Sequence, residues 1–226
     1  MIHDYERDIT KHCKQKVCIT LPKGYADSDE PWPVIVNLHT AGGFTSIADL
    51  PLFTGSIVIE PICEFGDIFR PDSIYMALQE ILGNIGQDII NKDKIAICGA
   101  SMGARGVWDT ICSYPNLFSC AVPISGFACY LRSSRIQHMP IWAFHGKQDT
   151  TVPPDEAIKM INSLGNNARM TLGEGGHGAY WNVYYSKVVR EWINGQSLMK
   201  NIVEKAKMNE EAKKLQESNV IDGANR

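Results

Sequence analysis

The centre of the chain reads Ile95-Ala96-Ile97-Cys98-Gly99-Ala100-Ser101-Met102-Gly103-Ala104. Its first four residues are apolar, which is typical of a buried strand. Residues 104–111 follow with apolar side chains at helical spacing. A Gly-x-Ser-x-Gly pattern between a strand and a helix predicts a very tight turn that lifts the hydroxyl of Ser101 above the sheet. The positions two before and two after this serine must be small because the turn leaves no space there.

Further strands and helices alternate on both sides of this turn. Short apolar runs predict strands at residues 17–21, 34–38, 57–59, 120–122 and 141–144, with a weaker one at 169–172. Helical periodicity predicts helices over residues 74–89, 157–164 and 181–192. This order predicts an α/β fold in one domain, with a mostly parallel central sheet of about seven to eight strands and helices on both faces. The site of such a sheet lies at the carboxyl ends of the strands.

The composition excludes several classes of protein. The chain has 226 residues, 44% of them hydrophobic, and a net charge of −3. It therefore has no basic surface for nucleic acid, and no run approaches the roughly 20 apolar residues that cross a bilayer. The first residues carry no secretory signal pattern, so we expect a cytoplasmic protein. The seven cysteines include no C-x-x-C pair and favour reduced, buried thiols, the alternative being one extracytoplasmic disulfide.

The character of the chain changes near residue 195. We expect a catalytic domain over residues 1–195 and a charged C-terminal helix or tail over residues 196–226, because residues 200–217 are rich in Lys, Glu and Asn. A solvated helix or frayed tail is the plain interpretation. A helix that docks or oligomerises is the alternative, which leaves a homo-oligomer open.

Two later loops carry the side chains that would activate Ser101. A serine hydroxyl is a weak nucleophile until a neighbouring base takes its proton. In a strand–turn–helix elbow of this kind, an acid and then a histidine follow the serine along the chain. Asp149 lies in a loop just after the strand predicted at residues 141–144, and His177 lies in a glycine-rich loop after residues 169–172. We therefore predict Ser101 as nucleophile, His177 as general base and Asp149 as the acid that orients the histidine.

The other histidines and acids have simpler interpretations. His39 and His145 each follow a strand, where a histidine commonly organises a loop through hydrogen bonds. His138 lies in a loop and is expected to be solvated, while His3 and His12 precede the sheet. Asp155 and Glu156 stand at the start of the helix predicted at residues 157–164 and are typical N-terminal capping charges.

An oxyanion hole needs two backbone donors. The N–H of Met102, the residue after the nucleophile, is the first. The turn at residues 38–43, after the second predicted strand, should supply the other, either from Ala41 or from Thr40.

With these loops placed, the chain resembles the α/β-hydrolase superfamily, and more narrowly its carboxylesterase, feruloyl-esterase-like and dienelactone-hydrolase-like branch. That branch also holds proteins labelled as predicted peptidases of prolyl-oligopeptidase type. The blocks Trp142-Ala143-Phe144-His145-Gly146 and Gly176-His177 carry the resemblance. Thr40 stands where members usually have glycine, which affects the oxyanion turn. Ser101 stands where dienelactone hydrolases proper have cysteine, which argues against that activity.

These features predict a serine hydrolase that cleaves carboxylic esters. Only residues 125–139 separate two predicted strands where many lipases insert a large lid, so we expect an open site for small or medium soluble esters. Candidate substrate contacts are Phe44, Phe127, Tyr130 and Tyr180, and Arg132 and Arg135 could attract an acidic substrate. A peptidase or amidase, a thioesterase and a non-catalytic binding protein remain alternatives. No cofactor is implied, and no metal-ligand spacing is present.

Overall fold

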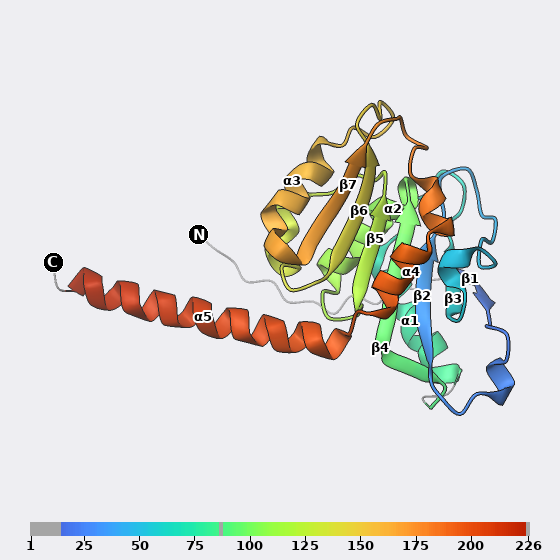
Figure 1. The fold of residues 1–226 in the computed structure, drawn as a ribbon, viewed down its shortest axis with the longest axis horizontal. Helices are drawn as coiled ribbons and strands as arrows, with labels where there is room; N and C mark the ends of the chain where they lie inside the picture. Colours follow the sequence, from blue (N-terminus) through green and yellow to red (C-terminus); the bar gives the residue numbers. More distant parts are fainter. Residues whose placement is uncertain (1–14, 86–87, 225–226) are drawn as a thin grey trace, which may run out of the picture.

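Seven strands form the central sheet of the molecule (Figure 1). The computed structural model describes residues 15–85 and 88–224, so His3, His12 and Cys13 lie outside the described residues. The strands are β1 (Lys16–Thr20), β2 (Trp32–Leu38), β3 (Ile57–Ile62), β4 (Ile90–Ala100), β5 (Cys120–Ile124), β6 (Ile141–Gly146) and β7 (Ala168–Gly173). Their order is β1-β3-β2-β4-β5-β6-β7. Only β1 is antiparallel to its neighbour, which confirms the expected mostly parallel sheet.

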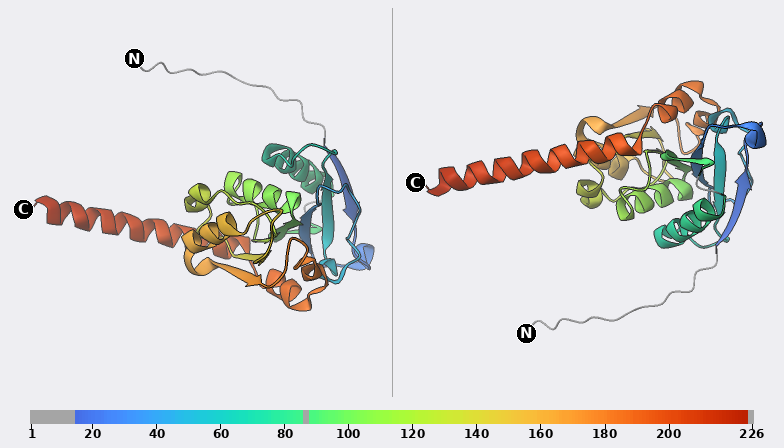
Figure 2. Two further views of the ribbon diagram at one scale, coloured as in Figure 1. Left: turned by 90° about the horizontal axis from the view of Figure 1, so that it is seen from above. Right: turned by 90° about the horizontal axis from the view of Figure 1, so that it is seen from below.

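Helices cover both faces of this sheet, as Figure 2 shows. The α-helices that pack on the sheet are α1 (Pro71–Asn84), α2 (Met102–Ser113), α3 (Asp155–Leu164) and α4 (Lys187–Asn194), and the short 3-10 helices include η2 (Pro51–Phe53), η3 (Tyr130–Arg135) and η5 (Trp181–Tyr185). One face of the sheet packs in a core with α1, α2 and α3. The other face packs with α4, η2 and η5. Because both faces are buried, the strands read as nearly continuous apolar runs.

Two elements differ from the prediction made from periodicity. α1 ends at Asn84 rather than at residue 89. The carbonyl of Ile89 instead accepts a hydrogen bond from the N–H of Trp32 at 2.7 Å, so Ile89 leads into the sheet. The helix predicted over residues 181–192 is divided into η5 and α4. The Ser186 hydroxyl lies between them and accepts a hydrogen bond from the Val189 N–H at 3.3 Å, which caps α4.

The connection from β5 to β6 is short. It consists of residues 125–140, all of them described, and contains only the 3-10 helix η3. No large lid is inserted here, which confirms the expectation from the sequence. His138 lies in this connection but is buried, with its Nε2 3.0 Å from the carbonyl oxygen of Pro115. The prediction that His138 is solvated was therefore wrong.

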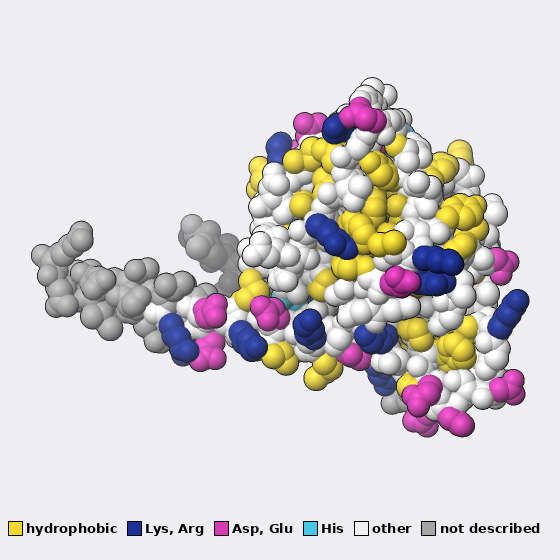
Figure 3. Space-filling view, in the orientation of Figure 1, with side chains coloured by type: hydrophobic (Ala, Val, Ile, Leu, Met, Phe, Trp, Pro, Cys, Tyr) yellow, Lys and Arg dark blue, Asp and Glu magenta, His cyan; other side chains and the backbone are white. Residues whose placement is uncertain are grey.

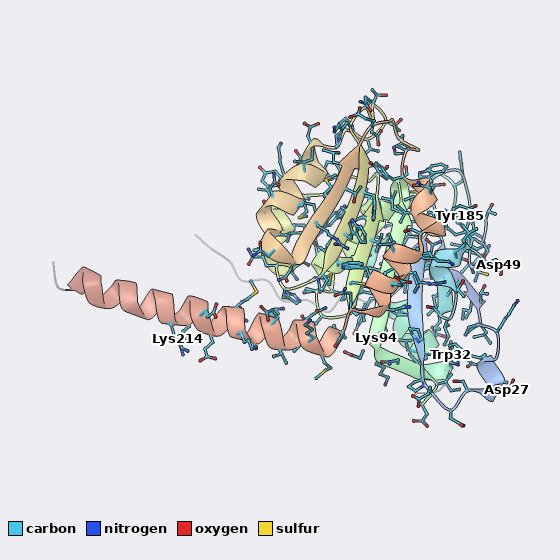
Figure 4. All side chains as sticks on the ribbon, viewed as in Figure 1. Asp27, Trp32, Asp49, Lys94, Tyr185 and Lys214 are labelled. Carbon is cyan, nitrogen blue, oxygen red and sulfur yellow. The ribbon has the colours of Figure 1, made fainter. Side chains whose placement is uncertain are left out.

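A long C-terminal helix, α5 (Leu198–Ala224), projects away from the sheet (Figure 1). Its described surface carries both Lys and Glu side chains (Figure 3). The base of the helix is held by buried Asn201, whose Nδ2 donates to the Ser119 carbonyl at 2.8 Å. Lys94, labelled in Figure 4, donates to the carbonyls of Asn194 and Gln196 at 2.9 and 2.5 Å. The division of the chain near residue 195 stays a prediction.

The described cysteines are all free. Three of them are buried: Cys98 in β4, Cys120 in β5 and Cys112 in α2. Burial raises the pKa of the Cys120 thiol to about 12, so this thiol stays protonated at neutral pH. Among residues 15–85 and 88–224, no helix combines the length and the apolar character needed to span a bilayer.

Candidate active site

Ser101 occupies a sharp turn between β4 and α2. Its φ of 54° and ψ of −116° lie outside the usual regions for a residue with a side chain. The flanking glycines make the turn possible, because a Cβ atom on Gly103 would lie 1.9 Å from the Leu38 carbonyl oxygen. A Cβ atom on Gly99 would lie 2.8 Å from backbone atoms of Gly103 and Leu38. The strained serine is therefore held above the carboxyl end of the sheet, as the motif predicted.

The side chains of Ser101, His177 and Asp149, from three loops, are connected by hydrogen bonds. The Nε2 of His177 lies 2.8 Å from the Oγ of Ser101. The Nδ1 of the same imidazole lies 2.7 Å from the Oδ2 of Asp149. The structure thus brings together the three residues that the sequence predicted, although they lie 28 and 76 positions apart along the chain.

Asp149 is buried and surrounded by donors. Its Oδ1 accepts hydrogen bonds from the backbone N–H groups of Thr151 at 3.0 Å and Val152 at 2.9 Å. Burial raises the pKa of this carboxyl, but the Val152 N–H and His177 together outweigh burial, so the pKa lies below the usual 3.8. Asp149 therefore stays ionised near neutral pH and favours the N–H of His177 on the Nδ1 side.

His145 and His39 organise the two loops nearest to these three connected side chains. The Nε2 of His145 lies 2.8 Å from the Val152 carbonyl and 3.2 Å from the Oδ2 of Asp149. Because a carbonyl only accepts, the Nε2 of His145 carries the proton. His39 bonds the Thr40 carbonyl through Nδ1 at 2.7 Å and accepts from the Cys63 N–H through Nε2 at 2.9 Å. Both histidines thus have the loop-organising contacts expected of them.

The predicted oxyanion donors come from two elements beside Ser101. Met102 is the first residue of α2, so its N–H lies at the positive end of the helix dipole. Thr40 and Ala41 follow β2, the strand paired with β4. Within the described residues, the N–H groups of Met102 and Ala41 donate to no other protein group. They are therefore free for a ligand, and so is the N–H of Thr40 among the described residues, since only the Thr40 carbonyl is bonded, to His39.

A cavity of about 370 Å³ opens beside the oxyanion turn. It is lined by Asn37, His39, Thr40, Gly42, Gly43, Thr45, Ile47, Leu50, Ala100, Trp181, Tyr184 and Tyr185. Tyr185, labelled in Figure 4, is the last residue of η5 and is exposed. The sequence analysis missed most of this lining, because it comes from a loop and a 3-10 helix that carry no motif. The volume is within the range of small-molecule sites.

The four predicted substrate contacts lie outside the lining of this cavity. Phe44 packs edge-on against His39, and Tyr180 lies against Phe144. Phe127 and Tyr130 are exposed near the end of β5. Their contact with substrate stays a prediction.

The two arginines considered for an acidic substrate have other partners. Arg132 pairs with Asp109 at 3.4 Å and bonds the Ser113 hydroxyl. Arg135 donates to the Cys112 carbonyl at 2.5 Å. Both therefore fix η3 against α2. In the part of the chain that the structure describes, no three potential metal ligands come together.

Comparisons with known proteins show what the chain is similar to. A family described as Phospholipase/Carboxylesterase matches residues 71–182, which include the elbow, the acid loop and the histidine loop. No curated protein gives a significant match in sequence.

Solved structures give the same fold. A thermostable esterase is 24% identical, with a TM-score of 0.70, over 81% of this chain and 59% of that protein. An acylaminoacyl peptidase is 14% identical, with a TM-score of 0.62, over 80% of this chain and 39% of that one. A phospholipase/carboxylesterase from Dyadobacter fermentans is 14% identical, with a TM-score of 0.60, over 82% of this chain and 99% of that protein. This chain thus spans less than two thirds of the thermostable esterase.

The sheet order and the strand–serine–helix turn give the chain the α/β-hydrolase fold that these solved structures share. With the family match over residues 71–182, the chain resembles the carboxylesterase-like branch of the α/β-hydrolase superfamily.

Proposed function

We propose that this protein is a serine hydrolase that cleaves carboxylic esters of small or medium size through an acyl-enzyme. The observation that carries the proposal is the hydrogen-bonded line from Asp149 through His177 to Ser101, with distances of 2.7 and 2.8 Å. These are the distances at which a base can take a hydroxyl proton. The strained backbone at Ser101 adds support, because such strain clusters at active sites.

In the first half of the reaction, the Oγ of Ser101 attacks the ester carbonyl while the Nε2 of His177 takes its proton. Asp149 holds the imidazole in the required tautomer and stabilises the imidazolium. The N–H groups of Met102 and Ala41 hold the negative oxygen of the tetrahedral intermediate. His177 then returns the proton to the leaving alcohol, and the acyl group stays on Ser101.

In the second half, water replaces the alcohol. His177 takes a proton from water, the resulting hydroxide attacks the acyl carbon, and the proton returns to Ser101 as the acid leaves. No group outside the chain is needed to balance these steps.

Labelling with a fluorophosphonate and hydrolysis of p-nitrophenyl acetate and butyrate test the proposal. We expect the wild type to be labelled, and Ser101→Ala to lose labelling and roughly 10⁴–10⁶ in kcat. Ser163→Ala is the matched control, because Ser163 is an exposed residue of α3. A folded wild type without labelling or turnover would favour a non-catalytic binding protein instead.

An amidase or peptidase activity is the second candidate, since the acylaminoacyl peptidase has the same fold. Hydrolysis of p-nitroanilides by the same preparation tests it. Faster cleavage of anilides than of matched esters would replace the ester proposal, and faster cleavage of a matched thioester would indicate a thioesterase.

A further inference from the structure

The floor of the cavity beside the oxyanion turn is polar and has no cationic partner. Asn37 lines the cavity and is 2% exposed, and its Nδ2 donates to the Oε1 of Glu60 at 3.0 Å. Glu60 is 1% exposed and also accepts from the Ile47 N–H at 3.3 Å and from the Ser46 hydroxyl. Among the described residues, no ion pair neutralises this carboxylate.

The hydroxyl of Tyr184 belongs to the same cluster. Tyr184 lines the cavity, and its ring stacks on Phe53 with centroids 5.9 Å apart. Burial, Cys98 and Glu60 hold the pKa of the Tyr184 hydroxyl well above its usual value, so the group stays a donor. Within the described part of the chain this hydroxyl has no hydrogen-bond partner. The hydroxyl is not among the fully buried side-chain atoms that lack a partner, so it is accessible from the cavity and can donate to a ligand there.

The position of the cavity assigns it to the acyl group. His177 must reach the oxygen of the leaving alcohol, so the alcohol lies on the side of the imidazole. The cavity is lined instead by the oxyanion turn and by Ala100, and neither His177 nor Ser101 belongs to its lining. Its walls are largely apolar or aromatic, from Ile47, Leu50 and Trp181. No Lys, Arg, Asp or Glu lines it.

We propose that the site selects uncharged acyl groups whose far end carries a hydroxyl oxygen, through Tyr184 and Asn37, and that Glu60 disfavours acyl groups ending in a carboxylate. This inference rests on the proposed esterase function. Tyr184 supplies the donor to the terminal oxygen. Glu60 holds Asn37 and the loop at Ile47 in place and adds a fixed negative charge behind the floor.

Three p-nitrophenyl esters with chains of similar length test the inference: 6-hydroxyhexanoate, heptanoate and monoadipate. They share one leaving group and end in a hydroxyl, a methyl or a carboxylate, the adipate having four methylenes and the other two five. We expect wild-type kcat/KM to fall in that order. Tyr184→Phe should lower the ratio of hydroxyhexanoate to heptanoate hydrolysis by about threefold to tenfold, as expected for one hydrogen bond.

Glu60→Gln tests the charge separately. A glutamine can keep the bonds to Asn37, Ile47 and Ser46 and removes only the charge, so adipate hydrolysis should rise about tenfold relative to heptanoate. Tyr114→Phe is the matched control, because the Tyr114 hydroxyl bonds Asp72 outside the cavity. This variant should leave all ratios unchanged.

Failure of the inference differs from failure of the function. Suppose that the protein hydrolyses p-nitrophenyl acetate but cleaves the three longer esters at equal rates, and that Tyr184→Phe changes none of these rates. This result would overturn the inference and leave the proposed esterase function in place. If no ester is cleaved, binding of 6-hydroxyhexanamide and heptanamide, followed through the fluorescence of Trp181, gives the answer. Preference of the wild type for the hydroxylated amide, lost in Tyr184→Phe, would support the cavity assignment, and equal binding would overturn it.

Discussion

Gly103 has no room for a side chain, because a Cβ atom there would lie 1.9 Å from the Leu38 carbonyl oxygen. Relief would require β2 and α2 to separate, which would move both Ser101 and the oxyanion turn. We therefore expect Gly103→Ala to lower the free energy of unfolding by more than about 2 kcal/mol. Denaturant unfolding and fluorophosphonate labelling measure the two effects.

Gly83→Ala is the matched control for this substitution. Gly83 lies within α1, and a Cβ atom there meets nothing within 4 Å. Alanine is the better helix former, so this variant should gain about 0.5–1 kcal/mol. Equal stability of the two variants would mean that the turn is looser than its geometry indicates.

The ionisation of Asp149 links the active site to stability in acid. Despite burial, the bonds from the Val152 N–H and His177 lower its pKa in the folded state below 3.8. A carboxyl with a lowered folded-state pKa stabilises the fold above its unfolded pKa, and this contribution is lost as the pH falls through the folded pKa. We expect the difference in unfolding free energy between wild type and Asp149→Asn to shrink below about pH 4. A difference that stays constant down to acid unfolding would contradict this link.

From its contacts, we expect His145 to hold Asp149 in position rather than to act on substrate. It is 1% exposed and reaches both Asp149 and the Val152 carbonyl. His145→Leu leaves that buried carbonyl without its donor, which should cost about 1–3 kcal/mol of stability and reduce kcat. His145→Gln can place a donor near the Nε2 position and should recover part of both. Turnover equal to wild type in His145→Leu would show that the acid loop holds its shape alone.

At the scale of elements, α5 depends on a few contacts at its base. Asn201 donates to the Ser119 carbonyl at 2.8 Å, and the Asp93 carboxylate accepts from the Met199 N–H at 2.6 Å. Asn201→Ala should cost about 1 kcal/mol and speed amide hydrogen exchange in the first turns of α5. Asn209→Ala, at an exposed position of the same helix, is the control. Equal exchange in the two variants would assign the anchoring to other contacts of the helix, such as Asp93 with the Met199 N–H and Lys205 with Asn116.

The elements themselves were mostly predictable from the sequence. Buried parallel strands such as β4 and β6 read as apolar runs, because α1 to α3 cover one face and α4 covers the other. The prediction extended α1 to Ile89 because the spacing of Ile89 fits a helix. In the structure the Ile89 carbonyl instead accepts a hydrogen bond from Trp32 of β2. The break at Ser186 has a local signal, a serine that can cap a helix, but apolar periodicity on both sides concealed it.

For the molecule as a whole, the sequence placed the candidate catalytic residues together more readily than it indicated the cavity beside them. Ser101, Asp149 and His177 lie in short loops directly after strands, so parallel topology alone brings them to one edge of the sheet. The floor of the cavity depends on Glu60 in β3 and Tyr184 in η5, which come together only when η5 packs against the sheet. No local spacing in the sequence signals such a contact.

The whole molecule also determines how the enzyme should respond to insoluble substrate. Residues 125–140 connect β5 to β6 through one short 3-10 helix, and no large lid covers the carboxyl end of the sheet in the described structure. A site without a lid needs no interface to open it. We expect the rate on tributyrin to saturate smoothly as the substrate concentration crosses its solubility limit, with no sudden increase. The rate on p-nitrophenyl butyrate in clear solution, with and without added emulsion, is the control. A rate that rises steeply only when emulsion droplets form would mean that part of the chain closes over Ser101 in solution.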